Sequence, residues 1–185
     1  MSYNGRRQDR LLNAGGENGA DSRKVENGMA IDKVKAYFRE QGIEERVLEF
    51  ATSSATVDLA AAAVGCEPAR IAKTLSFHVG ERVALVVTAG DARIHNQKFK
   101  AQFGAKAKML AADEAEPLIG HGVGGVCPFA VNDGCDVYLD ESLRRFDTVY
   151  PACGSANSAI CLTPDELKRY AAPCAWVDVC KLPEE

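Results

Sequence analysis

The stretch from Arg70 to Val79, RIAKTLSFHV, constrains the fold most strongly because it has a lysine where an apolar residue is expected. In a β-strand, side chains alternate between two faces, so Lys73 shares one face with Leu75 and Phe77. A lysine on the packed face either extends its ammonium past the rim of the core or faces a pocket that needs a cation. The stretch therefore predicts a buried strand with an inward-pointing Lys73, and both explanations stay open.

Strand and helix patterns alternate irregularly along the rest of the chain. Helical periodicity or capping residues predict helices at 30–41, 57–64, 112–119 and from Thr163 to about Tyr170. Strand patterns occur at 46–50, 83–88, 137–140, 148–150, 159–162 and 176–179, and residues 83–88 follow Gly80 closely enough to form a hairpin with the lysine strand. Hairpins mixed with irregular crossovers favour an α+β domain with a mixed, curved sheet.

Length and composition indicate one globular domain. The 185 residues are 46% hydrophobic and 26% charged, as in ordinary globular domains. Residues 1–28 contain few aliphatic side chains and read as a flexible tail or leader, so the expected domain is 29–185. No apolar run is long enough to span a membrane, and a cytoplasmic protein is expected.

The net charge of the chain and the spacing of its cysteines and histidines exclude some functions. With a net charge of -4, the whole molecule does not attract a phosphate backbone, so any nucleic-acid contact must be local. The seven cysteines include no CxxC pair, and the three histidines are not spaced to share a metal. We therefore expect free thiols in a reducing compartment and no metal.

One segment is locally basic. Between residues 92 and 110 all charged side chains are cations: Arg93, Lys98, Lys100, Lys106 and Lys108. This pattern is typical of a solvated helix that packs Phe99 and Phe103 inward. The same residues could instead form a small positive shelf for a nucleic-acid phosphate, and both interpretations stay open.

A glycine-rich stretch, GHGVGGVCPF, runs from Gly120 to Phe129. Its glycines leave the backbone almost bare, and Pro128 stiffens its end. Such a loop can present the N–H groups of Gly124 and Gly125 to a ligand. An ordinary wide turn between a helix and a strand is the alternative.

Several motifs occur together in a recognisable order. The chain contains RIAKTLSF, LVVTAGDARI, GVGGVCPF, VYLDESL and LTPDEL within residues 31–181. In this combination it resembles the YbaK/ProX family of aminoacyl-tRNA deacylases, which is related to the editing domain of bacterial prolyl-tRNA synthetases. The resemblance implies a mixed β-barrel-like sheet flanked by helices. It also places the family's key lysine at Lys73 and its GxxxP loop at Gly124 to Pro128.

The resemblance implies a reaction that needs no cofactor. The expected activity is hydrolysis of the ester between a wrong amino acid and the 3′-terminal adenosine of tRNA, with tRNA(Pro) carrying cysteine, alanine, serine or threonine as the expected substrate. A synthetase pocket rejects a near-isostere by only about 1 to 3 kcal/mol, so a second site must remove the errors. Prolyl-tRNA synthetase is a candidate partner.

Roles for individual residues follow from the resemblance. Backbone N–H groups of Gly124 and Gly125 would hold the carbonyl oxygen or the attacking water. Lys73 would hold a phosphate or the developing oxyanion if charged, or relay a proton if burial lowers its pKa. The residues expected to line the substrate pocket are Phe50, Thr74, Pro128, Gly154, Ser155 and Asn157. The residues expected to contact tRNA are Arg93, Lys98 and Lys100.

Two other functions are compatible with these residues. A non-catalytic module could capture tRNA ends or dock on a synthetase through the same lysine and loop. An esterase or thioesterase could instead use Cys127 as nucleophile and His121 as base. Relatives often have serine at the position of Cys127, which favours a tolerated small residue there.

Overall fold

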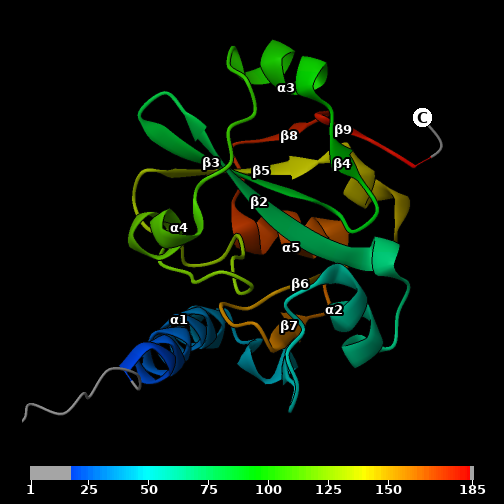
Figure 1. Cartoon of the computed structure of the whole chain (residues 1–185). Coiled ribbons are helices and arrows are strands. Elements are labelled where there is room, and N and C mark those ends of the chain that lie inside the picture. The colour runs from blue at the N-terminus through cyan, green and yellow to red at the C-terminus, as the bar shows by residue number, and fades with distance from the viewer. Residues whose placement is uncertain (1–17, 184–185) are drawn as a thin grey trace, which may run out of the picture.

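A computed structural model describes residues 18–183, with side chains placed from residue 29 onward. Figure 1 shows helices arranged around a twisted sheet. The α-helices of this part of the chain are α1 (Asn18–Glu40), α2 (Val57–Val64), α3 (Asn96–Phe103), α4 (Ala112–Ile119) and α5 (Pro164–Ala171). Short 3-10 helices cover Glu44–Arg46, Pro68–Arg70 and Glu141–Arg145.

The main sheet has five strands in the order β6 (Tyr150–Pro151), β2 (Ile71–Val79), β3 (Arg82–Ala89), β5 (Cys135–Asp140) and β8 (Ala175–Val177). β2 and β3 form an antiparallel hairpin, whereas β6, β5 and β8 join the sheet by parallel pairing. Two small antiparallel sheets pair β1 (Val47–Glu49) with β7 (Ser158–Ile160) and β4 (Arg93–Ile94) with β9 (Cys180–Lys181). The predicted α+β fold with a curved, mixed sheet is confirmed.

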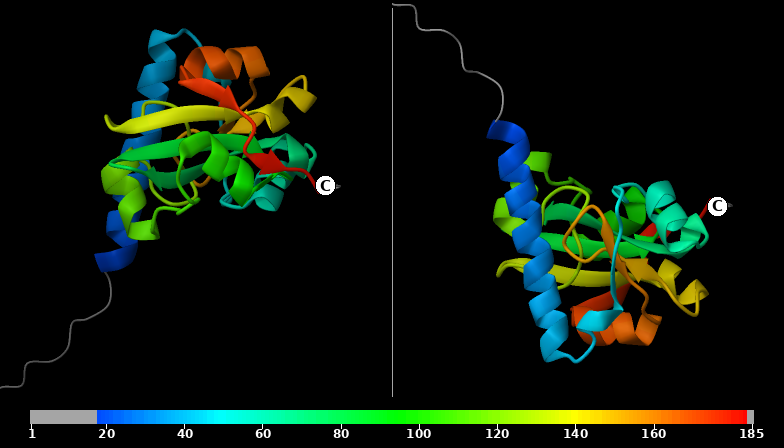
Figure 2. Two further views of the ribbon diagram at one scale, coloured as in Figure 1. Left: turned by 90° about the horizontal axis from the view of Figure 1, so that it is seen from above. Right: turned by 90° about the horizontal axis from the view of Figure 1, so that it is seen from below.

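The core fills both faces of the sheet. β3 is buried from Val83 to Ala89, as its apolar run predicts. On one face Phe77 of β2 meets Phe99 of α3, with ring centroids 4.8 Å apart. On the other side of the core, Phe38 of α1 packs on Phe129, also at 4.8 Å, and Figure 2 shows α1 lying across the strands. The loops between these elements are therefore attached to a sheet that is packed on both faces.

Helix boundaries follow local capping chemistry. The Thr56 hydroxyl accepts a hydrogen bond from the Leu59 N–H at the start of α2, and Gly65 ends that helix with φ +73°. Thr163 and Glu166 form the predicted capping box at the start of α5. These ends confirm the boundaries predicted from the sequence.

Two segments differ from the prediction. α1 begins at Asn18, so residues 18–28 are helical rather than part of a tail, and residues 1–17 of that predicted tail lie outside the described residues. Once the apolar residues of α1 pack, each further residue adds a backbone hydrogen bond, so a helix extends beyond its buried face. The basic segment 92–110 is helical only in α3, because Arg93 and Ile94 pair with β9. The predicted inward packing of Phe99 and Phe103 is confirmed.

Three features of the described residues bear on function. None of their helices is both long and apolar enough to cross a membrane. No cluster of three or more His, Cys, Asp or Glu side chains among them could hold a metal ion. All seven cysteines are free thiols, and Cys127, Cys153 and Cys180 are buried.

Candidate functional site

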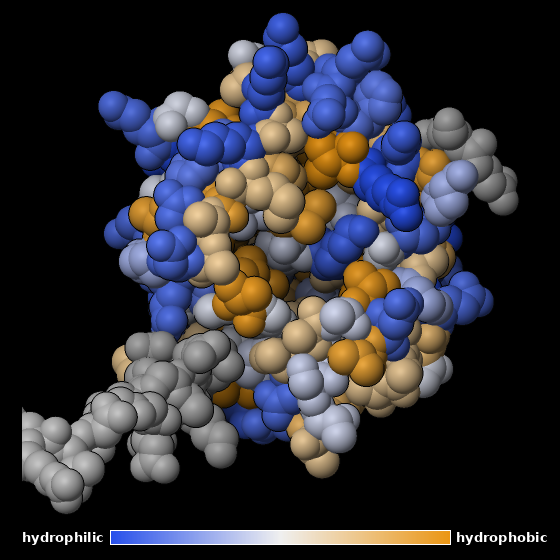
Figure 3. Space-filling view, in the orientation of Figure 1, coloured by the Kyte–Doolittle hydropathy of each residue, from blue (hydrophilic) through white to orange (hydrophobic). Residues whose placement is uncertain are grey.

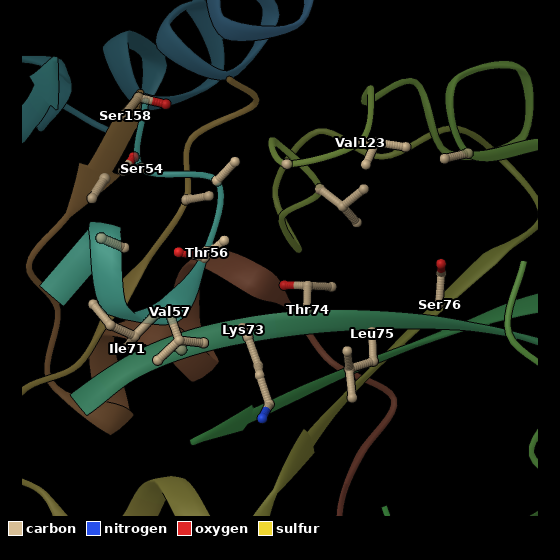
Figure 4. A pocket seen from close by; sticks show the side chains of 18 of the residues that line it. Ser54, Thr56, Val57, Ile71, Lys73, Thr74, Leu75, Ser76, Val123 and Ser158 are labelled. Atoms are coloured by element: carbon tan, nitrogen blue, oxygen red, sulfur yellow. The ribbon is translucent and has the colours of Figure 1, made fainter. Parts of the chain in front are cut away.

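A cavity of about 500 Å³ lies beside β2. Its walls come from β2, the segment that leads into α2, the segment before α4 and the glycine-rich loop. Figure 3 shows the hollow on this face with hydrophobic residues around it, and Figure 4 shows its lining from close by. Most lining side chains are small or aliphatic, and the hydroxyl-bearing ones are Ser54, Thr56, Thr74, Ser76, Tyr150 and Ser158. The cavity therefore suits a small, partly apolar ligand with a few hydrogen-bonding groups.

Thr74 supplies an unpaired polar atom to this cavity. β2 places its side chain on the face opposite Lys73, and Figure 4 shows it pointing toward the loop that contains Val123. Its Oγ1 is buried and has no hydrogen-bond partner among the described residues. Leaving a buried hydroxyl unpaired costs about 1 to 3 kcal/mol, so a ligand atom that pairs with it is favoured.

Gly124 forms part of the opposite wall. Its φ is +87°, and a Cβ at this position would lie 3.1 Å from the Ala55 Cβ and 3.2 Å from the Ala156 Cβ. Its N–H donates to no acceptor within the part of the chain that the structure describes. The backbone of Gly124 therefore borders the cavity, and its N–H is available to donate a hydrogen bond to a ligand.

Gly125 has a different role from the one predicted. Its N–H donates to the Gly122 carbonyl at 3.0 Å, so this donor is used inside the loop. A Cβ at Gly125 would lie 2.7 Å from the Gly154 carbonyl oxygen, closer than real Cβ atoms approach. Gly125 is needed for close backbone packing, and the expectation that its N–H faces a ligand is wrong in this structure.

Lys73 lies on the predicted inward face and is half-buried. Its main chain borders the cavity, but Figure 4 shows its side chain pointing away from Thr74. The ammonium donates to the Gly90 carbonyl at 2.9 Å and the Ala92 carbonyl at 2.6 Å. The expectation that this cation holds the developing oxyanion, beside the Gly124 N–H, is therefore wrong in this structure, because side chains alternate along β2 and the turn after β3 supplies its acceptors.

The surroundings of Lys73 affect its protonation. Burial lowers the pKa of Lys73, because the charged form loses hydration, and the nearby positive charge of Arg93 lowers it further. The nearby Asp91 and Cys180 act in the opposite direction. The net pKa is lowered, so a second anion close to the ammonium would stabilise the charged form.

The other predicted pocket residues do not line the cavity: Phe50, Pro128, Gly154, Ser155 and Asn157. Asn157 instead joins two loops, since its side-chain amide donates to the Phe50 carbonyl and its own carbonyl accepts from the Phe50 N–H, both at 2.8 Å. Ser155 donates to Ser158 Oγ at 2.8 Å. Phe50 and Asn157 therefore hold the loop before α2 against the loop before β7, and Ser155 bonds within the latter loop.

Several lining residues were missed from the sequence. Tyr150 and Ser158 come from strands far along the chain, and no local pattern links them to β2. Thr56 was recognised only as a helix cap, although it also lines the cavity. Met109 and Val123 remain 56% and 63% exposed while lining the same cavity, so they form an apolar rim.

Cys127 and His121, the pair considered for an alternative esterase, do lie next to each other. Sγ lies 3.7 Å from Nδ1, and both side chains are fully buried outside the cavity. Burial raises the pKa of Cys127 to about 12 and lowers the pKa of His121 to about 4. A protonated, inaccessible thiol is not a nucleophile, so this pair lacks the chemistry of a cysteine esterase.

The predicted tRNA contacts do not form one shelf. Lys98 donates to Asp178 at 3.0 Å and to the Cys180 carbonyl at 2.9 Å, whereas Lys100 lies exposed on α3. Arg93 lines a second cavity, of about 430 Å³, together with Lys73 and Lys181. The basic segment is therefore divided between a local ion pair and this second cavity.

Comparison with known protein families shows to which family the chain belongs. A model described as an aminoacyl-tRNA editing domain matches residues 51–170, which include β2, the glycine-rich loop and the cavity walls. The chain belongs to the aminoacyl-tRNA editing domain family. The resemblance seen in the sequence motifs is confirmed.

Individual relatives of the chain support the same family assignment. The chain is 51% identical over 154 residues to "Uncharacterized protein YwhH" of Bacillus subtilis, covering 83% of this chain and 98% of that protein. It is 26% identical over 124 residues to a proline–tRNA ligase of Bacillus cytotoxicus, covering 66% of this chain and 22% of the ligase. A crystal structure described as "a putative trans-editing enzyme for prolyl tRNA synthetase" superposes with a TM-score of 0.74 at 27% identity, over 82% of this chain and 97% of that one.

Proposed function

We propose that the protein hydrolyses the ester of a mischarged tRNA in trans, releasing a small amino acid and a tRNA with a free 3′-hydroxyl. The observation that supports this most directly is the cavity, where the unpaired Thr74 hydroxyl faces a wall containing the free Gly124 N–H. Membership of the aminoacyl-tRNA editing domain family supplies the substrate class.

The chemistry requires little from the protein because an aminoacyl ester is already reactive. In the proposed complex the Gly124 N–H donates to the ester carbonyl oxygen and stabilises the oxyanion that forms when water attacks the carbonyl carbon. Thr74 orients the amino acid or the water. Losing one oxyanion donor of this kind typically costs about 2.7 to 4 kcal/mol in the barrier. The ester C–O bond then breaks, and the terminal ribose leaves as the alcohol.

The lining of the cavity suits a small amino acid. Ala55, Ala60 and Ala72 form part of the wall, and Thr74 and Ser158 supply hydroxyls. Cysteine, alanine, serine and threonine are within this size class. The names of the ligase relative and of the solved neighbour point to tRNA(Pro) as the carrier and to prolyl-tRNA synthetase as the partner. Translation occurs in the cytoplasm, and the free thiols suit that compartment.

We retain Lys73 in the proposed site in its charged form. Its ammonium holds the carbonyls of the turn after β3 and so fixes the strand whose next residue is Thr74. From the same position it faces the second cavity, where a phosphate of the bound tRNA would oppose the effect of burial on its pKa. Lys73 then orients substrate rather than attacking it.

A deacylation panel tests the proposal. tRNA(Pro) charged with each amino acid in turn is incubated with wild type, Lys73→Ala and Thr74→Val, and the remaining ester is measured. We expect wild type to cleave at least one ester of a small amino acid, Lys73→Ala to abolish cleavage, and Thr74→Val to slow it about 10-fold, as for loss of one hydrogen bond of about 1.4 kcal/mol.

The panel also separates the alternatives. Thr74→Val keeps the shape of the side chain and removes the unpaired buried hydroxyl, so an equal or higher melting temperature with slower cleavage assigns the loss of activity to the hydroxyl. An ester that stays intact with excess wild-type protein, on every tRNA tested, would contradict the proposal and favour a non-catalytic module that binds tRNA ends.

A further inference from the structure

The second cavity gathers cations that form no salt bridge with a carboxylate among residues 29–183. It is lined by side chains of Lys73, Arg93 and Lys181 and by one carboxylate, that of Asp91. Asp91 is already paired with Arg145, whose Nη1 lies 3.1 Å from Oδ2. Lys73, Arg93 and Lys181 have no carboxylate partner among the described residues. The described lining of this cavity therefore has more cations than carboxylates, in a chain whose net charge is -4.

The arrangement of two of these cations is unfavourable by itself. Arg93 of β4 and Lys181 of β9 are direct cross-strand partners in an antiparallel pair. Like charges placed opposite each other destabilise such a pair of strands. The half-buried ammonium of Lys73 adds a third positive charge to the same cavity. An anion between the three would remove the repulsion.

The walls of the cavity are built for a compact ligand with several acceptor oxygens. The two exposed side chains can move to meet such a ligand, whereas Lys73 is fixed at its base by the carbonyls of Gly90 and Ala92. An arginine and a lysine on adjacent strands present both a planar fork and a compact ammonium, which together suit a phosphate group.

We propose that Arg93 and Lys181, with Lys73 at the base of the cavity, form an anion site that binds a backbone phosphate of the tRNA acceptor strand. This inference rests on the proposed function and extends it, because it places a phosphodiester on the face of β2 opposite the amino-acid cavity. Lys73 is the residue that borders both cavities, so the site links tRNA binding to the position of the strand that presents Thr74.

The salt dependence of tRNA binding tests the site without using hydrolysis. Binding of deacylated tRNA is titrated over a series of salt concentrations for wild type and for the double variant Arg93→Gln, Lys181→Gln. Each phosphate contact to a single strand contributes about 0.7 to the slope of log K against log salt, so loss of the one proposed contact should lower the slope by about 0.7 in the double variant. The matched control is Lys168→Gln with Arg169→Gln, which removes two exposed cations of α5 that line neither cavity.

The outcomes separate this inference from the proposed function. A slope for the double variant equal to that of the control variant overturns the site, even if deacylation is normal. A wild type that cleaves no ester while the double variant shows the expected change in slope overturns only the proposed function. If inorganic phosphate raises the melting temperature of wild type more than that of the double variant while the tRNA slope is unchanged, the site takes free phosphate and the tRNA assignment is wrong. A second double variant, Glu184→Gln with Glu185→Gln, tests the chain's own carboxylates. If this variant changes the melting temperature and added phosphate does not, those carboxylates occupy the site and the inference fails.

Discussion

At the scale of single residues, burial keeps the Cys127 thiol protonated and unreactive. The thiol lies near the His121 ring but has a pKa raised to about 12, so it stays protonated at neutral pH. We expect Cys127→Ser to keep deacylation within about 2-fold of wild type, since the side chain lines no part of the cavity. Stability should fall by about 1 to 3 kcal/mol, because a hydroxyl costs more to bury than a thiol. Initial rates and urea unfolding measure the two effects. A rate reduced 100-fold at unchanged stability would restore the cysteine to the mechanism.

The sequence predicted where some site residues point, but not which groups they bind. The period of two correctly placed Lys73 and Thr74 on opposite faces of β2, and glycine content correctly marked Gly124 as bare backbone. What the ammonium binds depends on the turn after β3, where the acceptors are backbone carbonyls that no side-chain pattern reveals. The use of the Gly125 N–H inside its loop was hidden for the same reason.

At the scale of elements, the loop before β7 positions the cavity wall. Asn157 holds it to the loop before α2 through the Phe50 carbonyl, and the Ala156 carbonyl accepts from the Ser54 N–H. We expect Asn157→Ala to raise the KM for mischarged tRNA by about 5- to 10-fold while kcat changes less, because the removed hydrogen bond is worth about 1 kcal/mol and lies behind the wall. Asn96→Ala, which removes an exposed amide of α3, is the control and should leave both constants unchanged. Equal losses in kcat and kcat/KM would instead place Asn157 in contact with the reacting groups.

Elements with their own capping residues were predicted well, and elements made by distant pairing were not. α2 and α5 contain their stop and start signals within a few residues, so their bounds agree with the structure. β4 exists only because Arg93 and Ile94 meet β9 nearly ninety residues later, a pairing that local propensity does not encode. The second cavity, and with it the grouping of Arg93 with Lys181, was therefore invisible in the sequence.

At the scale of the whole molecule, an ion pair between the segment before β1 and α5 makes stability depend on pH. Arg46, just before β1, donates to Glu166 of α5 at 2.7 Å and 3.1 Å. These bonds, with that from the Thr163 N–H, lower the pKa of Glu166 from 4.5 to about 2. A carboxylate with a lowered pKa stabilises the fold above its unfolded pKa, and this contribution is lost as pH falls through the folded pKa.

Glu166→Gln isolates that contribution because glutamine can keep the capping-box contact while losing the charge. Both partners are about one third exposed, so solvent screens the pair and we expect the variant to be less stable at neutral pH by about 1 kcal/mol at most. The difference from wild type should stay constant above about pH 4.5 and shrink between about pH 4.5 and about pH 2. Urea unfolding of both proteins across this range gives the difference directly, and other carboxylates cancel in it. A difference that does not shrink would mean that Glu166 acts through packing, and that Arg46 holds this region through its bond to the Cys161 carbonyl, just after β7.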